Sequence, residues 1–403
     1  MVRWRVLSSS GLLVRQGDSV SSEQLGRLEC GTTVEELQLC GERLRYQLLS
    51  GQGPATGWVS LRLKGKDLLC PLDGWQLEPG LAIGPWLAHE DKVTSVLLDF
   101  FHQRLWTSCW SQSSVKSWHL SARGANRLAE LQSHGLVADL AVTQDFLVTA
   151  ISANPMPEGN VCHQADFKQR MAELDDQLKA GQQLVLWRVE DQPRLHRELP
   201  RHQRGCNLLS LCPAGPAGLL ASASKDALVV SRVDDFEVLW TVALDSKLQG
   251  LCWAPCAEPR LWSFDGRHAK LWEDGREKTS VRLEVENVSA LTPLKDLLLV
   301  AHETGFMFLN SDDGQMLWQQ YTKDVVCAAK ALGESCFVAA VGCNVVKYQL
   351  AEGAKASKAS KASAAGMWTF PSKVISLDCH SGPDISLVAA GCADGRAAVF
   401  DAT

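Results

Sequence analysis

The segment RLWTSCWSQSSVKSWHL at residues 104–120 consists of an apolar run, small polar residues and a second apolar run that contains Trp118. Residues 386–401, SLVAAGCADGRAAVFD, repeat this arrangement, with a turn at Asp394 and an aromatic residue at Phe400. Apolar and polar residues that alternate with a period of two, interrupted by turn residues, are typical of two antiparallel strands joined as a hairpin. The sequence therefore predicts a hairpin unit that recurs along the chain.

Five further segments share this pattern, so we expect seven units. They lie at residues 146–152 continued by 183–189, and at 219–233, 260–274, 297–310 and 336–350. When an insertion at 153–180 is set aside, the units are spaced by about 40 residues, which is typical of four-stranded propeller blades. An apolar run precedes each unit, and a strand that often ends in tryptophan follows, as at Trp240, Trp318 and Trp368. Each unit is therefore expected to supply four strands.

The last unit reaches only its third strand at Thr403, whereas residues 81–88 resemble an outer strand with Trp86 in the tryptophan position. Pairing between 81–88 and the last unit would remove two exposed strand edges, which are a hazard for aggregation. We therefore predict an all-β fold in which a seven-bladed propeller over residues 81–403 is closed by this pairing.

The repeated segments resemble WD repeats over about residues 80–403. His89, Ser108 and Trp118 match the histidine, the Ser/Thr-bearing strand and the strand-ending tryptophan of that family. The resemblance extends to the later tryptophans Trp187 and Trp272 and to the turn aspartates Asp226, Asp265 and Asp394. It implies that these side chains have structural roles in the propeller. The repeats are degenerate, because only the first unit keeps His, Ser and Trp together and its turn reads SQSS where aspartate is expected.

Residues 1–68 differ from the repeats, with short apolar stretches between glycine-rich turns, and predict a small all-β barrel. The segments WRV, GLLVR, GTTVEE and GWVS (57–60) resemble bacterial-type SH3 (SH3b) domains, of the kind found in dinoflagellate and other algal multidomain proteins. The resemblance implies a shallow aromatic groove that binds extended or proline-rich peptides.

The candidate residues of this groove are Trp4, Tyr46 and Trp58, with Arg43 and Arg45 at its rim. In the alternative interpretation, Trp4 and Trp58 fill the interior of a small barrel that has few other large side chains. The peptide-binding interpretation requires their rings to be accessible at the surface.

Residues 69–80 contain two prolines and two glycines and are expected to form an extended, semi-rigid linker. Within the insertion 153–180, four apolar residues recur at helical spacing, which predicts a helix with one apolar stripe. They are Phe167, Met171, Leu174 and Leu178. The stripe packs either on the propeller or on a partner.

Residues 354–365 repeat Lys-Ala-Ser three times, which predicts a flexible spacer between two strands. In an alternative interpretation the serines of this segment are phosphorylated. These serines are Ser357, Ser360 and Ser363.

No motif of catalysis is evident, because the sequence has no phosphate-binding loop, G-x-S-x-G elbow or H-E-x-x-H helix. The 14 cysteines include no C-x-x-C pair, so we expect free thiols, no metal and no cofactor. The net charge of −6 argues against binding to nucleic acid, and no apolar run reaches the length of about 18 residues that a membrane helix needs.

These features predict a cytoplasmic protein, with the nucleus as the alternative location, that acts as a non-enzymatic scaffold for protein or peptide partners. The alternative function is that of a propeller enzyme or ligand-binding protein that uses the central channel. A cluster of ionisable groups with shifted pKa values in the channel would favour that alternative.

Overall fold

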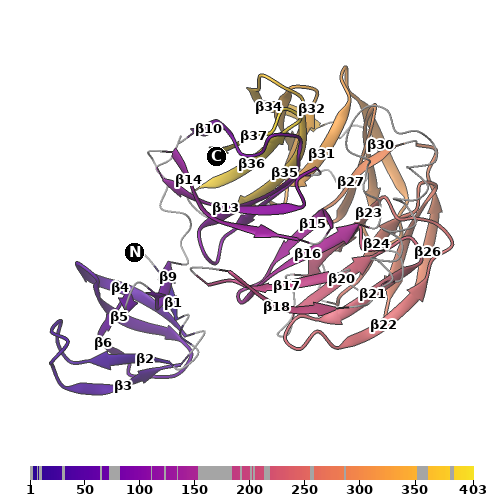
Figure 1. Ribbon diagram of the computed structural model, residues 1–403. Helices are drawn as coiled ribbons and strands as arrows, with labels where there is room; N and C mark the ends of the chain where they lie inside the picture. Colours follow the sequence, from indigo (N-terminus) through magenta and orange to yellow (C-terminus); the bar gives the residue numbers. More distant parts are fainter. Residues whose placement is uncertain are drawn as a thin grey trace, which may run out of the picture. The chain divides into compact units, whose positions relative to one another are not determined.

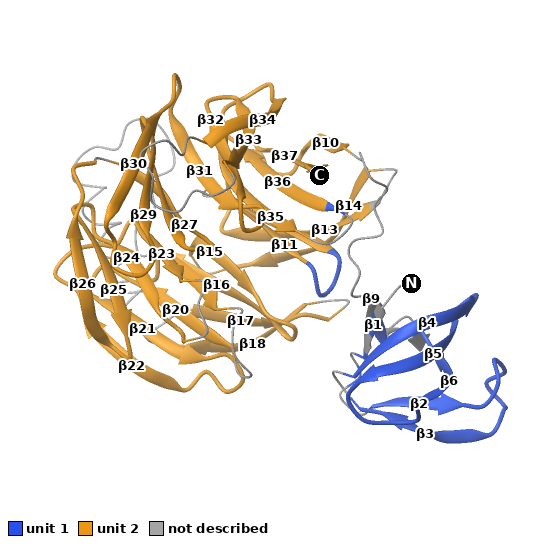
Figure 2. Cartoon of the chain, turned by 180° about the vertical axis from the view of Figure 1, so that it is seen from behind, with its two compact units in different colours: residues 1–79, 100–103, 382–385 blue, residues 80–99, 104–381, 386–403 orange. Residues whose placement is uncertain are grey.

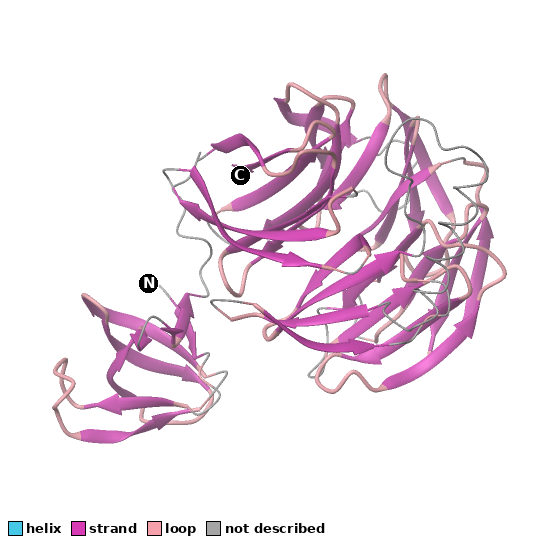
Figure 3. Ribbon diagram, in the orientation of Figure 1, coloured by secondary structure: helices cyan, strands magenta, loops and turns pink. Residues whose placement is uncertain are grey.

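A computed structural model describes residues 3–403 except 7, 9–10, 30–31, 64–65, 72–81, 110, 122–123, 134, 153–183, 191–192, 200–201, 203–204, 213–217, 255–257, 286, 352–361 and 382–384. All regular secondary structure in the described residues consists of β-strands (Figure 3). None of these residues forms a helix long and apolar enough to cross a bilayer. The predicted helix with Phe167, Met171, Leu174 and Leu178 lies outside the described residues, as do Ser357 and Ser360.

The chain divides into two compact units (Figure 2). Unit 1 comprises residues 1–79, 100–103 and 382–385, and unit 2 comprises the remainder. Unit 1 contains a seven-stranded antiparallel sheet with the strand order β3-β2-β6-β5-β4-β1-β9, which we call the N-terminal sheet. Its strands are β1 (Arg3–Val6), β2 (Leu12–Arg15), β3 (Gln24–Leu28), β4 (Thr33–Cys40), β5 (Arg43–Ser50), β6 (Thr56–Ser60) and β9 (Leu69–Pro71). The short strands β7 (Arg62–Leu63) and β8 (Lys66–Asp67) pair with each other.

The predicted linker at 69–80 begins too early, because β9 is part of the N-terminal sheet. Trp4 of β1 lies opposite Pro71 of β9, and Val6 lies opposite Leu69. This pairing satisfies backbone groups along an edge of β1 that would otherwise be open.

Unit 2 contains, within the described residues, seven four-stranded antiparallel sheets (Figure 1). Sheet 1 consists of β11 (Val93–Asp99), β12 (Arg104–Cys109), β13 (Ser114–Ser121) and β14 (Gly124–Gln132). Sheet 2 consists of β15 (Leu136–Val142), β16 (Phe146–Ser152), β17 (Leu184–Arg188) and β18 (Arg194–Leu199). Sheet 3 consists of β19 (Leu208–Cys212), β20 (Leu219–Ala223), β21 (Ala227–Arg232) and β22 (Val238–Ala243).

The remaining sheets follow the same order along the chain. Sheet 4 consists of β23 (Gly250–Trp253), β24 (Leu261–Phe264), β25 (His268–Glu273) and β26 (Arg276–Arg282). Sheet 5 consists of β27 (Val288–Leu294), β28 (Leu297–His302), β29 (Gly305–Asn310) and β30 (Met316–Tyr321). Sheet 6 consists of β31 (Val326–Ala331), β32 (Cys336–Val341), β33 (Asn344–Leu350) and β34 (Ala362–Thr369). Sheet 7 combines β35 (Val374–Ser381), β36 (Ser386–Cys392) and β37 (Arg396–Asp401) with β10 (Ala82–Leu87).

The sheets form a closed ring around their first strands. The inner strands β11, β15, β19, β23, β27, β31 and β35 each contact the next one along the chain, and β35 contacts β11. In sheet 7, Ala82 of β10 lies opposite Phe400 of β37, and Leu87 lies opposite Arg396. This is the pairing between 81–88 and the last unit that the sequence predicts.

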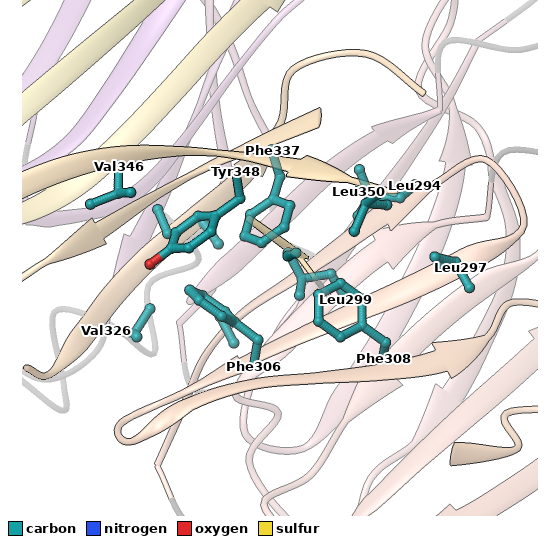
Figure 4. Packing of buried hydrophobic residues seen from close by; sticks show 14 of the residues in the cluster. Leu294, Leu297, Leu299, Phe306, Phe308, Val326, Phe337, Val346, Tyr348 and Leu350 are labelled. Atoms are coloured by element: carbon teal, nitrogen blue, oxygen red, sulfur yellow. The ribbon is translucent and has the colours of Figure 1, made fainter. Parts of the chain in front are cut away.

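Hydrophobic side chains fill the space between adjacent sheets (Figure 4). Between sheets 5 and 6, the rings of Phe306 and Phe337 meet edge to face, with centroids 5.2 Å apart. Phe337 also stacks on Tyr348 at 4.9 Å. Such rings contribute both buried apolar area and favourable ring geometry, so they fix how the two sheets pack.

Two sequence-based boundaries differ from the structure. Trp240, Trp318 and Trp368 lie within the outer strands β22, β30 and β34 and do not end them. The predicted spacer at 354–365 extends too far, because Ala362–Thr369 form β34 and Ser363 lies opposite Gln349. The small residues of this segment complete the sheet along the free edge of β33.

Candidate functional site

The first candidate group comprises His89 and the aromatic-ended strands of sheet 1. The imidazole Nε2 of His89 lies 2.9 Å from the Thr107 hydroxyl, and the Trp118 indole N–H donates to the same hydroxyl at 2.9 Å. The Nδ1 of His89 lies 2.9 Å from the amide oxygen of Gln112, which belongs to the SQSS turn. Gln112 thus contacts the histidine from the turn position where the sequence comparison expected aspartate, and sequence reasoning missed it.

Ser108, the hydroxyl predicted for this group, has no part in it. Successive side chains on a strand point to opposite faces, so Thr107 and Ser108 cannot both face Trp118. The Ser108 hydroxyl is buried and makes no hydrogen bond to the described residues. Thr107 is the residue that joins the histidine to the tryptophan.

The same arrangement recurs in two other sheets at equivalent positions. The Trp187 indole N–H donates to the Thr149 hydroxyl at 3.2 Å, and the Trp272 indole N–H donates to the Ser263 hydroxyl at 2.8 Å. All these side chains are buried, and a buried indole N–H needs an acceptor. The indole N–H groups of Trp187 and Trp272 therefore each have an acceptor on the neighbouring strand of their own sheet.

The predicted turn aspartates hold hairpin turns between central strands. Asp265 accepts hydrogen bonds from the backbone N–H groups of Arg267 and His268, at 2.9 and 2.7 Å. Asp394 accepts from the backbone N–H of Arg396 at 3.3 Å, and Asp226 accepts from the Ser224 hydroxyl at 2.5 Å. This is the ordinary role of aspartate in tight turns, and it requires no bound ligand.

The second candidate group lies on the inner strands, and sequence reasoning missed it. Asp139 of β15 accepts hydrogen bonds from the backbone N–H groups of Leu140 and Leu209, at 2.9 and 2.8 Å, and so links sheets 2 and 3. Asp378 of β35 accepts from the backbone N–H of Leu98 at 2.8 Å and links sheets 7 and 1. In the sequence, each aspartate is the single acidic residue within an apolar run, at 137–143 and 374–380, and this pattern could have indicated a buried polar role.

Lys330 of β31 interacts electrostatically with both carboxylates, and we call these three residues the inner-strand cluster. Burial lowers the pKa of Lys330, but Asp378 and Asp139 outweigh this effect, so the pKa is raised. Burial raises the pKa of Asp139 to about 6, and it also raises the pKa of Asp378. The side chains of Asp139 and Asp378 are half-buried, whereas Lys330 is exposed, and all three belong to the inner strands of the ring.

Within the described residues, no three His, Cys, Asp or Glu side chains converge as metal ligands. A pocket of about 560 Å³ in unit 2 is lined by charged side chains that form ion pairs with one another. Arg260 binds Asp312 at 2.7 Å, and Lys278 binds Glu273 at 2.6 Å.

The third candidate group is the predicted peptide groove of the N-terminal sheet, and two of its residues are not at the surface. Trp4 is buried and its indole N–H donates to Glu36 at 2.9 Å. Tyr46 is fully buried, and its hydroxyl donates to the Pro54 carbonyl at 2.8 Å. Burial also raises the pKa of Tyr46. The period of two along β5 turns Tyr46 inward with Leu44, so the prediction that Trp4 and Tyr46 line a groove is wrong.

The other three predicted groove residues, Trp58, Arg43 and Arg45, lie on the outer face of the same sheet. Trp58 is half-buried and lies opposite Arg45 on one side and Arg15 on the other. Arg43 donates to the Asp18 carbonyl at 2.8 Å and to the Ser60 hydroxyl at 2.7 Å. The structure therefore brings Trp58 and the arginines together without Trp4 and Tyr46.

Comparisons with known proteins identify the fold of the second unit. No protein family profile and no curated protein matches the chain. Among solved structures, BBS1N in complex with ARL6DN is similar, with a TM-score of 0.60 and 11% identity over 81% of this chain and 96% of that one. The WD40 β-propeller domain of Doa1 has a TM-score of 0.57 and 12% identity, covering 81% of this chain and 97% of that one.

Sqt1 of Saccharomyces cerevisiae is also similar, with a TM-score of 0.55 and 11% identity over 80% of this chain and 99% of that one. At such low identity the similarity defines the fold alone. The ring of four-stranded sheets is a β-propeller of the kind found in WD40 domains.

Proposed function

We propose that the protein is a non-enzymatic scaffold that binds protein or peptide partners. In this proposal the seven sheets are the blades of one WD-repeat propeller, and the N-terminal sheet is an SH3-like barrel that adds a second binding surface. Ten cysteines of the described residues are free thiols, which supports a reducing compartment such as the cytoplasm or the nucleus.

The observation that carries this proposal is the use of the buried polar groups. His89, Thr107 and Trp118 bond to one another, and Asp139 and Asp378 bond to the backbone of the next sheet. Groups engaged in this way stabilise the ring and are not free to act on a substrate. We therefore assign the function to the protein surface, which is available for binding partners. A similar structure, BBS1N, is described in complex with another protein, ARL6DN.

Affinity capture tests the scaffold proposal. The intact chain, used as bait in a lysate, is expected to retain a reproducible set of proteins. A chain without residues 1–71 is expected to lose a subset of them, provided that its unfolding transition is retained. If both baits retain only what an unrelated propeller retains, the proposal is wrong.

The inner-strand cluster favours a second candidate function, the binding of a small charged ligand at the centre of the ring. Lys330 and the two aspartates provide both signs of charge in a partly solvated setting. A panel of small zwitterions and carboxylates tests this function by thermal shift. A compound that stabilises the natural chain but not K330M would support it, and no shift with any compound would oppose it.

A further inference from the structure

We propose that the outer face of the N-terminal sheet around Trp58 binds an extended acidic peptide. The proposal rests on the scaffold function and deepens it by naming a site and the chemistry of its partner. Trp58 of β6 is the centre of the site, because Arg15 of β2 and Arg45 of β5 are its two cross-strand neighbours. Side chains in such pairs lie on one face, with Cβ atoms about 5 Å apart. The three residues therefore form one row across the sheet, which we call the arginine–tryptophan row.

The ring of Trp58 is available to a partner. It is half-buried, and its indole N–H makes no hydrogen bond to the described residues. This distinguishes it from Trp4, which is buried and donates to Glu36. A partly exposed tryptophan whose N–H has no partner among the described residues is typical of binding sites.

Among the described residues, Arg15, Arg43 and Arg45 have no carboxylate partner. Arg15 donates to the Ser22 carbonyl at 2.5 Å, and Arg43 donates to the carbonyls of Asp18 and Gly17, so both are held by neutral backbone oxygens. Within the described residues, Arg15, Arg43 and Arg45 form no ion pair. Three guanidinium groups thus lie around Trp58 without an ion pair to a described carboxylate, and Asp18 acts on Arg43 only as a weaker electrostatic neighbour.

Like charges are held close together on this face. Burial lowers the pKa of Arg43, and the positive charge of Arg15 lowers it further. The Asp18 carboxylate acts in the opposite direction but is the smallest of these effects. Holding two guanidinium groups together costs free energy, and an anionic partner would remove that cost.

The chemistry of the row selects an acidic peptide. Planar guanidinium groups bind carboxylates through two parallel hydrogen bonds, and the flat face of Trp58 packs against an apolar side chain or a peptide bond. In an extended peptide, alternate side chains point the same way, which matches the spacing of charged and aromatic groups across neighbouring strands. Single-stranded nucleic acid fits less well, because it requires several stacking rings in succession, and the row supplies one. The net charge of the chain, −6, also opposes it.

Fluorescence anisotropy with the full-length chain tests the proposal. The probe is a fluorescein-labelled peptide of about twelve residues with alternating glutamate and valine, and the control probe has glutamine in place of glutamate. We expect the glutamate peptide to bind roughly tenfold more tightly than the glutamine peptide at about 0.05 M salt. This preference should shrink severalfold at about 0.5 M salt.

Two variants locate the binding. Arg45 is exposed and its side chain makes no hydrogen bond or ion pair to the described residues, so R45Q should fold normally and weaken binding of the glutamate peptide roughly fivefold. W58F keeps a ring in the half-buried position and should weaken binding of both peptides. R197Q removes an exposed arginine of β18 in unit 2 and should change nothing.

Three results would overturn the proposal. They are equal binding of the two peptides or binding of neither, equal effects of R45Q and R197Q, and tighter binding of a labelled oligouridine than of the glutamate peptide. Affinity capture separates these results from a failure of the scaffold function. If the chain retains partners through unit 2 but does not bind the acidic peptide, the scaffold function stands and only the proposed peptide site is wrong.

Discussion

The indole N–H of Trp118 and the imidazole of His89 both contact the hydroxyl of Thr107, each at 2.9 Å. In six of the seven sheets, the type of residue at the position of Thr107 depends on the type at the position of Trp118. Where the aromatic residue is tryptophan, the other position carries a hydroxyl: Thr149 accompanies Trp187, and Ser263 accompanies Trp272. Ser222 occupies the position in sheet 3, where Ser231 replaces the aromatic residue and His202 lies 3.0 Å from the Ser222 hydroxyl.

The three remaining sheets have alanine at this position. They are Ala301, Ala339 and Ala390, and the aromatic residues of those sheets are Phe308, Tyr348 and Phe400. An indole N–H inside the protein needs an acceptor, whereas a phenyl ring does not. The degeneracy of the repeats is therefore coordinated in six sheets, because a hydroxyl accompanies tryptophan and alanine accompanies phenylalanine or tyrosine. Sheet 3 lacks the tryptophan but keeps the Ser222 hydroxyl, which lies within hydrogen-bond distance of His202.

Replacement of Thr107 by valine should destabilise the protein. T107V keeps the shape but removes the acceptor, so the buried N–H of Trp118 is left without a partner, at a cost of about 2 kcal/mol in the free energy of unfolding. T107S keeps the hydroxyl and should cost about 1 kcal/mol, through the lost methyl group. Chemical denaturation measures both. Equal losses in the two variants would show that the hydrogen bond contributes little.

The contribution of His89 should depend on pH. Burial lowers the pKa of His89, with smaller opposing effects from hydrogen bonds. The native state then binds fewer protons than the unfolded state, whose histidine pKa is about 6.5. The stabilisation is complete above that value and is lost as the pH falls through the lower native pKa.

The variant H89Q keeps a hydrogen-bonding side chain that does not titrate. Its deficit in stability relative to the natural chain should be larger at about pH 7.5 than at about pH 5. Urea denaturation at both values measures this difference, and the other histidines cancel because both proteins contain them. A deficit that grows on acidification would contradict the assignment.

How far the sequence determines the fold is visible in the repeats. The segment 104–120 predicts a hairpin because its polar residues alternate, and β12 and β13 occupy it. The same pattern misassigned Ser108, because two adjacent hydroxyl residues satisfy the motif equally well. Only the register, in which Leu105 lies opposite Trp118, places Thr107 and not Ser108 on the face of the ring.

Gly395 should be essential for closure of the ring. Its φ is +84°, and a Cβ there would lie 2.1 Å from the backbone oxygen of His89. The Gly395 carbonyl also accepts hydrogen bonds from the N–H groups of Ala88 and His89, at 2.9 and 3.0 Å. G395A should therefore cost about 3 kcal/mol and speed amide exchange at Ala88 and His89.

Gly333 provides the matched control, because its φ is +111° but the nearest atom to an added Cβ is 3.9 Å away. G333A introduces backbone strain alone and should cost about 1 kcal/mol, without changing exchange at Ala88. If G395A and G333A had equal effects, close packing at the closure would not matter.

The candidate site was less predictable than the fold. Aromatic residues at 4, 46 and 58 look equivalent in the sequence, yet the pairing of β5 with β6 turns Tyr46 inward and leaves Trp58 outward. Arg15 reaches the Trp58 row only through the single pair between β2 and β6. The inner-strand cluster joins residues almost 240 positions apart, from Asp139 to Asp378, and no local pattern reports such proximity.

Replacement of Lys330 tests whether the inner-strand cluster is structural. Burial raises the pKa of Asp139 to about 6, against about 3.9 in an unfolded chain, so its contribution to stability falls as the pH rises between those values. Lys330 limits that fall by attracting the carboxylates of Asp139 and Asp378. In K330M their pKa values should rise further, and the loss of stability should extend to higher pH.

We therefore expect K330M to cost about 1–2 kcal/mol near pH 8, a figure reduced because solvent reaches the cluster, and to cost less near pH 5. K323M removes an exposed lysine of the same unit and should change stability by less than about 0.5 kcal/mol at either pH. Urea denaturation of the three proteins decides the matter. A K330M chain as stable as K323M at pH 8 would show that Lys330 does not stabilise the folded protein. Ligand binding would then be the role that remains for the inner-strand cluster.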